Sequence, residues 1–286
     1  MEISAQKVKE LRERTSVGMM DCKKALQECA GDMEASIDWL RQKGLAKAAK
    51  KAGRATSEGL IAYRAAKDNS AAALVEVMCE TDFVSRGDKF QAFASSVVNA
   101  VFEKKPTDHD ALLALVGDDL NNQIATLGEN MTIGRHVFLQ APAPGLVGSY
   151  IHSNGKIGVL VELAFEKAES AANPAVLELV KNLAMQVAAA NPAALDKTGL
   201  DPALVERERA LYRQKTLEEG KPAAMVDKIV EGRIAKFCQD VCLLDQPYIR
   251  DDKMRIREVV EACVKQTGGK ITVKSFVRLQ LGEKTL

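Results

Sequence analysis

An internal repeat limits the folds open to this chain more than any other feature of its sequence. When the chain is shifted by 86 residues, GLIAYRAAKDNSAAALVEVMCE, which begins at Gly59, aligns with GLVGSYIHSNGKIGVLVELAFE, which begins at Gly145. Further along, Pro106 meets Pro192 without a gap. Because a duplicated segment repeats its structural unit, the repeat predicts two related modules of similar fold.

Within each copy, strand and helix patterns follow in the same order. Two strand-like runs joined by a turn come first, and a helix that ends near the proline follows. Both helices carry apolar residues at helical spacing, namely Phe90, Phe93, Val97 and Val101 in the first copy and Val176, Leu179, Leu183 and Val187 in the second. A further helix and a third strand are predicted at 111–124 and 131–139, and again at 253–266 and 271–281.

The second copy contains a segment that the first copy lacks. Residues 201–219 and 223–241 have helical patterns, and Gly220-Lys221-Pro222 separates them. Two helices joined by so short a turn predict an antiparallel helical hairpin, or coiled coil, that stands off the core.

The residues before the repeat form a unit of their own. Residues 1–43 predict three short helices, and Gly44 is expected to end the third. Residues 44–58 are rich in alanine and lysine and nearly devoid of large apolar side chains, which predicts a basic linker. The predicted fold class is α+β, with antiparallel sheets, and the predicted parts are a three-helix domain (1–43), the linker (44–58), a core N-subdomain (59–140) and a core C-subdomain (141–286) that contains the hairpin (201–241).

The composition is that of a soluble globular protein, with 47% hydrophobic and 28% charged residues. Forty basic residues face 39 acidic ones, which argues against wholesale electrostatic binding of nucleic acid. No apolar run approaches the roughly 20 residues that span a bilayer, and the first residues do not resemble a secretory signal. The six cysteines form no CxxC pair, so we expect reduced thiols in a cytoplasmic protein.

No familiar catalytic or ligand-binding pattern is present in the sequence. The chain lacks GxxxxGK[ST] and a GxGxxG after a strand, so we expect no direct binding of a nucleotide. It has three histidines and no HExxH, GxSxG or Cys/His cluster. Glu76 recurs as Glu162, which predicts an outward-facing strand position rather than part of a carboxylate site. We therefore predict a protein that is not an enzyme and that uses no metal and no cofactor.

The repeat also singles out one aromatic residue. TDFV at 81–84 aligns with KAES at 167–170, so Glu169 stands where the first copy has Phe83. The shared scaffold thus does not require an aromatic residue after the second strand. Phe83 is then either a local core contact of the first copy or an exposed aromatic anchor for a partner.

Several stretches of the chain resemble segments of a known family. LRERTSVGMMDCKKAL at 11–26 and EVMCETDFV at 76–84 are similar to its two signatures, although Ser16 replaces the usual glycine. ATLGENMTIGRHV at 125–137, GSYIH at 148–152 and GKPAAMVDKIVEGRIAKF at 220–237 are similar to further segments in the same order. The family is that of bacterial elongation factor Ts, and the resemblance extends over nearly the whole chain.

The resemblance implies a guanine-nucleotide exchange factor for the GDP-bound form of elongation factor Tu, the GTPase that delivers aminoacyl-tRNA. It also implies an N-terminal bundle like a ubiquitin-associated (UBA) domain. By the same resemblance, Phe83 would wedge into the GTPase domain near its Mg²⁺, Asp82 would displace a partner helix, and Thr81 and Val84 would hold the direction of the loop. The other implied partner contacts are Val8, Lys9, Leu11, Met19, Met20, Lys23, Leu127, Gly128 and His152.

Two other functions remain open from the sequence. A non-exchanging protein-binding or holdase module would bind the same partner without changing nucleotide release. An RNA-binding protein would use the cations at 47–54, although no aromatic RNA-binding motif accompanies them. Met20 is equally compatible with a place in the core of the bundle.

Overall fold

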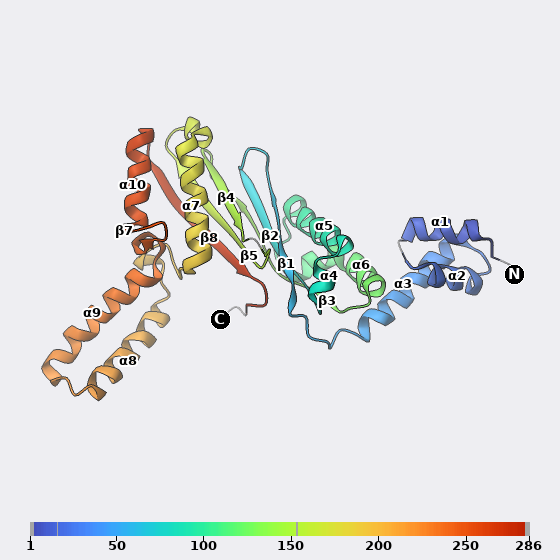
Figure 1. Ribbon diagram of the computed structural model, residues 1–286, viewed down its shortest axis with the longest axis horizontal. Helices are drawn as coiled ribbons and strands as arrows, with labels where there is room; N and C mark the ends of the chain where they lie inside the picture. Colours follow the sequence, from blue (N-terminus) through green and yellow to red (C-terminus); the bar gives the residue numbers. More distant parts are fainter. Residues whose placement is uncertain (1–2, 16, 153, 284–286) are drawn as a thin grey trace.

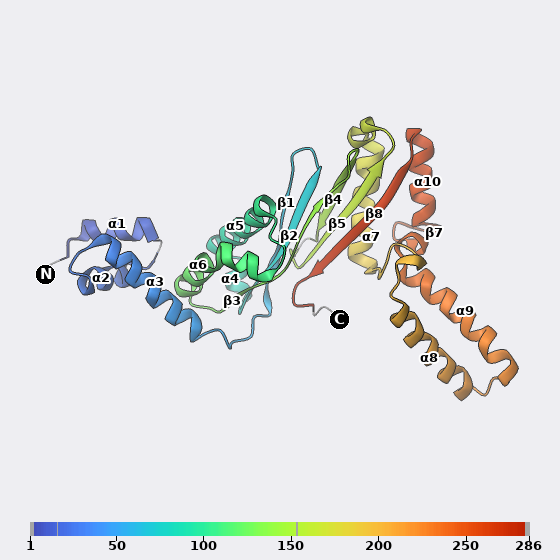
Figure 2. The ribbon, with the colours of Figure 1, turned by 180° about the vertical axis from the view of Figure 1, so that it is seen from behind.

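The chain forms an elongated molecule with four parts in a row: a helical bundle, two α+β subdomains and a helical hairpin (Figures 1 and 2). The structure is a computed structural model, and it describes residues 3–15, 17–152 and 154–283. Ser16 of the N-terminal signature and Ser153 lie outside the described residues. The bundle and the hairpin lie at opposite ends, so the two subdomains form the centre of the molecule.

Each subdomain consists of a three-stranded antiparallel sheet with helices on one face. The first has the strand order β1-β2-β3 and comprises β1 (Glu58–Ala65), β2 (Ala71–Cys79), α4 (Asp82–Ser85), α5 (Asp88–Lys104), α6 (His109–Leu127) and β3 (Met131–Gln140). The second has the order β4-β5-β8 and comprises β4 (Gly145–Ile151), β5 (Ile157–Phe165), the 3-10 helix η1 (Ala168–Ala172), α7 (Pro174–Ala190), α10 (Ile256–Thr267) and β8 (Ile271–Gln280).

The repeat in the sequence corresponds to a repeat in the structure. Strands β2 and β5 begin and end 86 residues apart, and so do helices α5 and α7. Both helices end at residues with left-handed backbone, Lys105 with φ 50° and Asn191 with φ 43°. The predicted pairs of related strands and helices are confirmed.

The two sheets lie face to face, and the helices cover their outer faces. In β2, Val75 and Val77 pack under α5 and α6, whereas Leu74 packs against the second subdomain. In β5, Val161 packs under α7 and α10, whereas Leu160 faces the first subdomain. The central strand of each sheet is therefore covered on both faces, and β2 is buried along nearly its whole length.

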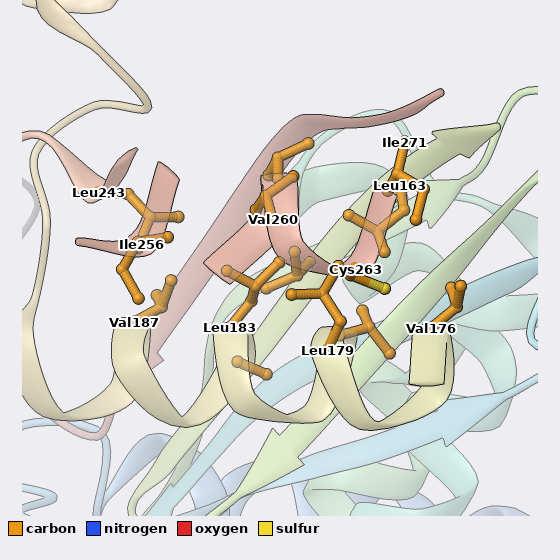
Figure 3. Close-up of a cluster of buried hydrophobic side chains, with 14 of the residues drawn as sticks. Leu163, Val176, Leu179, Leu183, Val187, Leu243, Ile256, Val260, Cys263 and Ile271 are labelled. Carbon is orange, nitrogen blue, oxygen red and sulfur yellow. The ribbon is translucent and has the colours of Figure 1, made fainter. Parts of the chain in front are cut away.

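The core of the second subdomain shows how its helix fits this layer. One face of α7 carries apolar side chains that point towards α10 and the strands (Figure 3). These are the predicted core residues of the helix, Val176, Leu179, Leu183 and Val187, and all of them are buried. Their counterparts in α5, which are Phe90, Phe93, Val97 and Val101, are buried in the first subdomain.

The predicted outward position of Glu76 is wrong, because the sister sheet covers the face of β2 that turns away from the helices. Glu76 is only 3% exposed. Its carboxylate accepts a hydrogen bond from the backbone N of Gly282 at 2.6 Å and lies 3.4 Å from Nε of Arg135. A buried carboxylate needs such partners, and here they attach the chain after β8 to the first subdomain.

The segment inserted in the second copy forms the predicted antiparallel hairpin of α8 (Pro202–Glu218) and α9 (Ala223–Val241). Its small core includes Val226, Val230 and Ile234 of α9. The short elements at its base are η2 (Lys197–Gly199), η3 (Leu243–Asp245), β6 (Pro247–Tyr248) and β7 (Asp251–Arg255).

The helix predicted at 253–266 begins three residues late. Residues 253–255 belong to β7, which pairs with β6, and α10 starts at Ile256. The side chain of Glu258 accepts a hydrogen bond from the backbone N of Arg255 at 2.7 Å, which marks the first turn of the helix.

The N-terminal bundle contains the three predicted helices, α1 (Ala5–Thr15), α2 (Met19–Glu28) and α3 (Met33–Ala49). Asp32 caps α3, since its Oδ1 accepts a hydrogen bond from the backbone N of Ala35 at 2.8 Å. The helices enclose a core of Val8, Leu11, Cys22, Ala25, Leu26 and Leu40.

Gly44 does not end the third helix, which runs on to Ala49 and shortens the predicted linker. The next residues, LAKAA, favour a helix. Gly44 lies where α3 meets α6, and a Cβ atom there would come 3.7 Å from the Cβ of Ala125. Arg41 of α3 also forms an ion pair with Asp118 of α6. Helix α3 therefore joins the bundle to the first subdomain.

Replacing Gly158 by alanine is expected to destabilise the protein by about 1–3 kcal/mol. A Cβ atom at Gly158 of β5 would come 2.6 Å from Cγ2 of Ile61 in β1, where the two sheets meet. The branched side chain of Ile61 has little freedom to move away. Urea unfolding followed by circular dichroism measures the change.

The matched control is Gly117→Ala in α6, where an added Cβ meets no described atom within 4 Å. Alanine is a better helix former than glycine by up to about 1 kcal/mol, so this variant should be slightly more stable than the parent. Equal effects of the two substitutions would contradict the close contact between the sheets.

Candidate partner-binding site

One large aromatic side chain stands almost fully exposed on the first subdomain. Phe83 is 86% exposed, the highest value among the large hydrophobic side chains described. The alternative that Phe83 is a core contact of its own subdomain is therefore wrong. Its segment is also not a loop, because residues 82–85 form the single helical turn α4. An exposed aromatic residue of this kind is typical of an anchor for a partner protein.

Hydrogen bonds hold α4 at its beginning and at its end. Thr81 is its N-cap, and its Oγ1 accepts a hydrogen bond from the backbone N of Val84 at 3.4 Å. At the other end, Nε2 of Gln91 in α5 donates to the carbonyl oxygen of Ser85 at 2.7 Å. Val84 packs against the core of the first subdomain. Phe83 thus projects from a turn whose neighbours are fixed.

The loop after α6 lies directly beside α4. Helix α6 ends at Leu127, which packs against the core, and Gly128 follows with a φ of 84°, a backbone conformation that favours glycine. The carboxylate of Glu129 accepts two hydrogen bonds from Thr81, from its backbone N at 3.0 Å and from its Oγ1 at 2.6 Å. The structure therefore brings together the two segments that the resemblance assigned to the partner.

A second set of contacts holds this region to the end of β2. Oε1 of Glu80 accepts a hydrogen bond from the backbone N of Asn130 at 2.6 Å and lies 3.4 Å from Nη1 of Arg54. Asn130 is 2% exposed, and its side chain donates to the carbonyl oxygen of Arg54 at 2.7 Å. The segment after α3 is thereby attached to the base of the site.

Glu129 and Asn130 were not among the predicted site residues. The 86-residue repeat does not point to Asn130, because the insertion in the second copy shifts its counterpart to Lys270. Only the structure shows the correspondence, since Glu166 accepts an equivalent hydrogen bond from the backbone N of Lys270 at 3.1 Å. The pairing of Glu129 with Thr81 joins residues 48 positions apart, and the sequence carries no signal for it.

The residues around Phe83 include an exposed charged one and a buried neutral one. Asp82 is half-exposed and pairs with Arg86 one turn later, with 3.1 Å between Oδ2 and Nη2. Directly beneath, Cys79 donates from its Sγ to the carbonyl oxygen of Thr81 at 3.2 Å. Burial, and secondly the charge of Glu129, raise the pKa of the Cys79 thiol to about 11. The site thus presents an apolar ring and an acid above an unreactive, buried thiol.

The candidate residues of the N-terminal bundle divide into two groups. Met19 and Met20 are 52% and 77% exposed, so Met20 is not part of the bundle core. Lys9 and Lys23 are exposed as well. Val8 and Leu11, in contrast, are buried in the bundle, so their side chains do not reach the surface.

Asp21 lies between these exposed residues and helix α3. Its carboxylate accepts hydrogen bonds from Nζ of Lys43 at 2.8 Å and from Nζ of Lys47 at 2.9 Å. These two hydrogen bonds hold the pKa of Asp21 below its ordinary value. They also fix the first turn of α2, which carries Met19 and Met20, against α3.

His152 lies in the second subdomain, directly after β4, and it is exposed. Its Nδ1 is 3.2 Å from the hydroxyl of Tyr150. The turn that follows His152 contributes Asn154 and Gly155 to a groove of about 850 Å³, whose other side is formed by β1, α5 and α4 with Asp82. One groove thus runs between the two candidate contact regions.

The described residues contain no group of three or more His, Cys, Asp or Glu side chains arranged to hold a metal ion. In the same part of the chain, none of the helices combines the length and the apolar character needed to cross a lipid bilayer. What the surface presents is an exposed ring, a neighbouring acid and two exposed methionines. The fold and the site together define an α+β protein whose first subdomain exposes an aromatic ring beside an acid.

Comparison with known proteins gives the family of this protein. The family described as Elongation factor TS matches residues 80–283. Elongation factor Ts of Desulfovibrio desulfuricans is 58% identical over 280 residues, which cover 98% of each chain. That of Nitratidesulfovibrio vulgaris is 55% identical and covers 99% of this chain and 97% of its own, and that of Clostridium perfringens is 46% identical with 98% and 93% covered. The chain belongs to the elongation factor Ts family, as the resemblance predicted.

Iodoacetamide at pH 8 is expected to alkylate Cys29 well before the other five cysteines. Cys29 is partly exposed, and the others are buried. Burial raises the pKa of Cys79 and of Cys242 to about 11, so on the order of 0.1% of each is thiolate at pH 8, compared with roughly a quarter of an ordinary cysteine. Peptide mass spectrometry over time measures the labelling, and guanidinium should make all six react. Labelling of Cys79 as fast as Cys29 in the folded protein would contradict its burial.

Proposed function

We propose that the chain is a guanine-nucleotide exchange factor for elongation factor Tu and that it promotes the release of GDP during translation elongation. Membership of the elongation factor Ts family supports the proposal. The single observation that carries its mechanism is the 86% exposure of Phe83 on a turn that is held at both ends.

The mechanism rests on the way a GTPase holds GDP. The phosphates are bound by a phosphate loop and by Mg²⁺, and this metal requires a nearly ideal octahedral arrangement of ligands. A small displacement of those ligands therefore weakens the binding of both metal and nucleotide. In this proposal Phe83 enters the GTPase domain near the Mg²⁺ site, and Asp82 contacts and displaces a neighbouring helix of the partner.

The other site residues have supporting roles. Thr81 and Val84 hold the direction of α4, and Leu127 and Gly128 brace the same partner helix. The N-terminal bundle grips the GTPase domain from another side with Lys9, Met19, Met20 and Lys23, whereas the buried Val8 and Leu11 keep α1 in place. His152 contacts a different domain of the partner.

Several contacts away from the nucleotide make the exchange energetically feasible. Their binding energy holds the partner in a conformation with low affinity for GDP. By linkage, the factor by which the exchange factor weakens the nucleotide equals the factor by which the nucleotide weakens the exchange factor. Since about 1.4 kcal/mol corresponds to a tenfold change, a coupling of several kcal/mol is needed if release is to be faster by orders of magnitude.

This proposal assigns no covalent chemistry and no bound nucleotide to the chain itself. The chain acts in the cytoplasm on the GDP-bound form of the partner, and rebinding of GTP or GDP ejects it. It therefore changes the rate of nucleotide release by binding, without being an enzyme in the chemical sense.

The basic segment at 47–54 gives little support to the alternative of an RNA-binding protein. Lys47 is engaged with Asp21, and Arg54 pairs with Glu80. Nζ of Lys51 is 3.4 Å from the carbonyl oxygen of Ile124. These three cations form contacts within the chain that connect α2, α3, α6 and the end of β2, whereas Lys50 is exposed.

Phe83→Ala should lower the maximal rate of GDP release from elongation factor Tu by at least about tenfold, which corresponds to about 1.4 kcal/mol of activation free energy. The wedge is lost, but the other anchors still bind. Because the side chain is exposed, the thermal unfolding temperature should change little. Release of mant-GDP, a fluorescent analogue of GDP, measured over a range of chain concentrations, gives the maximal rate and the half-saturating concentration.

The control variant is Leu115→Ala, which removes another exposed apolar side chain from the same subdomain and should release mant-GDP at the parental rate. If Phe83→Ala is folded and binds the partner but releases GDP as fast as the parent, the proposed role of Phe83 is wrong. If the parent itself forms the complex without accelerating release, the chain is the non-exchanging module instead.

A further inference from the structure

We propose that Glu129 is a positioning residue for nucleotide exchange, which acts through Thr81 to hold the turn that carries Phe83. The inference rests on the proposed exchange function, and it assigns Glu129 a role through another residue of the same chain.

Both hydrogen-bond donors of Thr81, its backbone N and its hydroxyl, are bonded to Glu129. A carboxylate can only accept hydrogen bonds, so the hydroxyl of Thr81 must donate its one proton to Glu129, over 2.6 Å. The backbone N of Thr81 donates to the other oxygen of the carboxylate over 3.0 Å. The lone pairs of the hydroxyl then remain free to accept from the backbone N of Val84 at 3.4 Å. Glu129 thus fixes the threonine in the orientation that caps α4.

Helix α4 needs this support because it is very short. Its four residues form one turn, and an isolated turn has almost no stability of its own. Phe83 contributes little to its anchoring, since 86% of its surface is exposed. The direction of the ring is therefore set by the contacts of the neighbouring residues. At the beginning of the turn these include the two hydrogen bonds to Glu129, beside the bond from the thiol of Cys79 to the carbonyl oxygen of Thr81.

The second copy shows which contacts the scaffold itself requires. The hydrogen bond of Glu80 to the backbone N of Asn130 recurs there as the bond of Glu166 to Lys270. The pair of Thr81 and Glu129 does not recur, because lysine and glycine occupy the corresponding positions, 167 and 269. The second copy also has no aromatic residue at the place of Phe83. The Thr81–Glu129 pair thus occurs only in the copy that carries the exposed ring, and the fold shared by the two copies does not require it.

Glu129 also connects two contact regions. It directly follows Leu127 and Gly128, which the proposed function assigns to the brace on the partner helix. Its hydrogen bonds to Thr81 therefore fix the position of Leu127 and Gly128 relative to Phe83, so that a displacement of one region also moves the other. Loss of this link is expected to impair displacement of the metal ligands more than binding of the partner.

The test measures mant-GDP release from elongation factor Tu and separates the maximal rate from the half-saturating concentration. Glu129→Ala should lower the maximal rate by about tenfold and change the half-saturating concentration by less than about threefold, because the remote anchors persist. Glu129→Gln, which keeps one acceptor, should fall between this variant and the parent. Thr81→Val should resemble Glu129→Ala, and Thr81→Ser should retain more activity than Thr81→Val. Asp119→Asn, an exposed acid of α6, is the control and should behave like the parent.

Amide hydrogen exchange provides a readout that does not depend on the partner. Exchange in the peptide 80–87 should be about tenfold faster in Glu129→Ala, since the amides of Val84 and Ser85 are bonded to Thr81. The corresponding peptide of the second copy, 166–173, serves as the control within the same molecule and should not change. Glu129→Gln gives the same comparison if the alanine variant is unstable.

The results distinguish this inference from the proposed function. If Glu129→Ala leaves both the maximal rate and the exchange of 80–87 within twofold of the parent, Glu129 does not position the turn. A raised half-saturating concentration with an unchanged maximal rate would make Glu129 a direct binding contact and overturn the inference. If the parent does not accelerate GDP release, the proposed function fails, whereas faster amide exchange in the variant would still support the hold of Glu129 on α4.

Discussion

The contact between the two sheets is the constraint on which the rest of the structure depends. Each sheet has one face for its helices and one for its sister, so residues such as Leu74 and Leu160 face each other's subdomains across the interface. Space there is so limited that Gly158 leaves no room for a methyl group beside Ile61. Because the sheets cover each other, α4 on one subdomain and the turn after β4 on the other lie along one groove.

Corresponding positions of the two modules are alike in the core and differ at the surface. The helices α5 and α7 bury the same four positions, which is what a shared core requires. At the end of the second strand the copies differ, and the first places an exposed aromatic residue where the second has glutamate. A duplication thus separates residues that fold the module from residues that are free to bind a partner.

Most of the fold could be predicted because it depends on local patterns. Helical spacing, alternation and turns identified both copies and the hairpin, and comparison of the copies identified Phe83. The errors came from contacts between distant residues. Glu76 was placed outside because no local pattern indicates that a second sheet covers it, and Gly44 was taken as a helix end although α3 continues along α6. For the same reason Glu129 was missed, because its hydrogen bonds join it to Thr81, 48 positions away in the sequence.

Helix α3 determines how the N-terminal bundle is placed relative to the first subdomain. A helix advances about 1.5 Å and turns about 100° with each residue. Since α3 runs without interruption from the bundle to its contact with α6, its length sets both the distance and the rotation of the bundle relative to the first subdomain. One residue more or fewer between Leu40 and Gly44 would turn the two parts of α3 against each other by about 100°, so Leu40 in the bundle core and Lys47, which pairs with Asp21, could not both keep their contacts with α2. The number of residues in α3 therefore determines where the bundle, with its exposed methionines, lies relative to the first subdomain and its exposed ring.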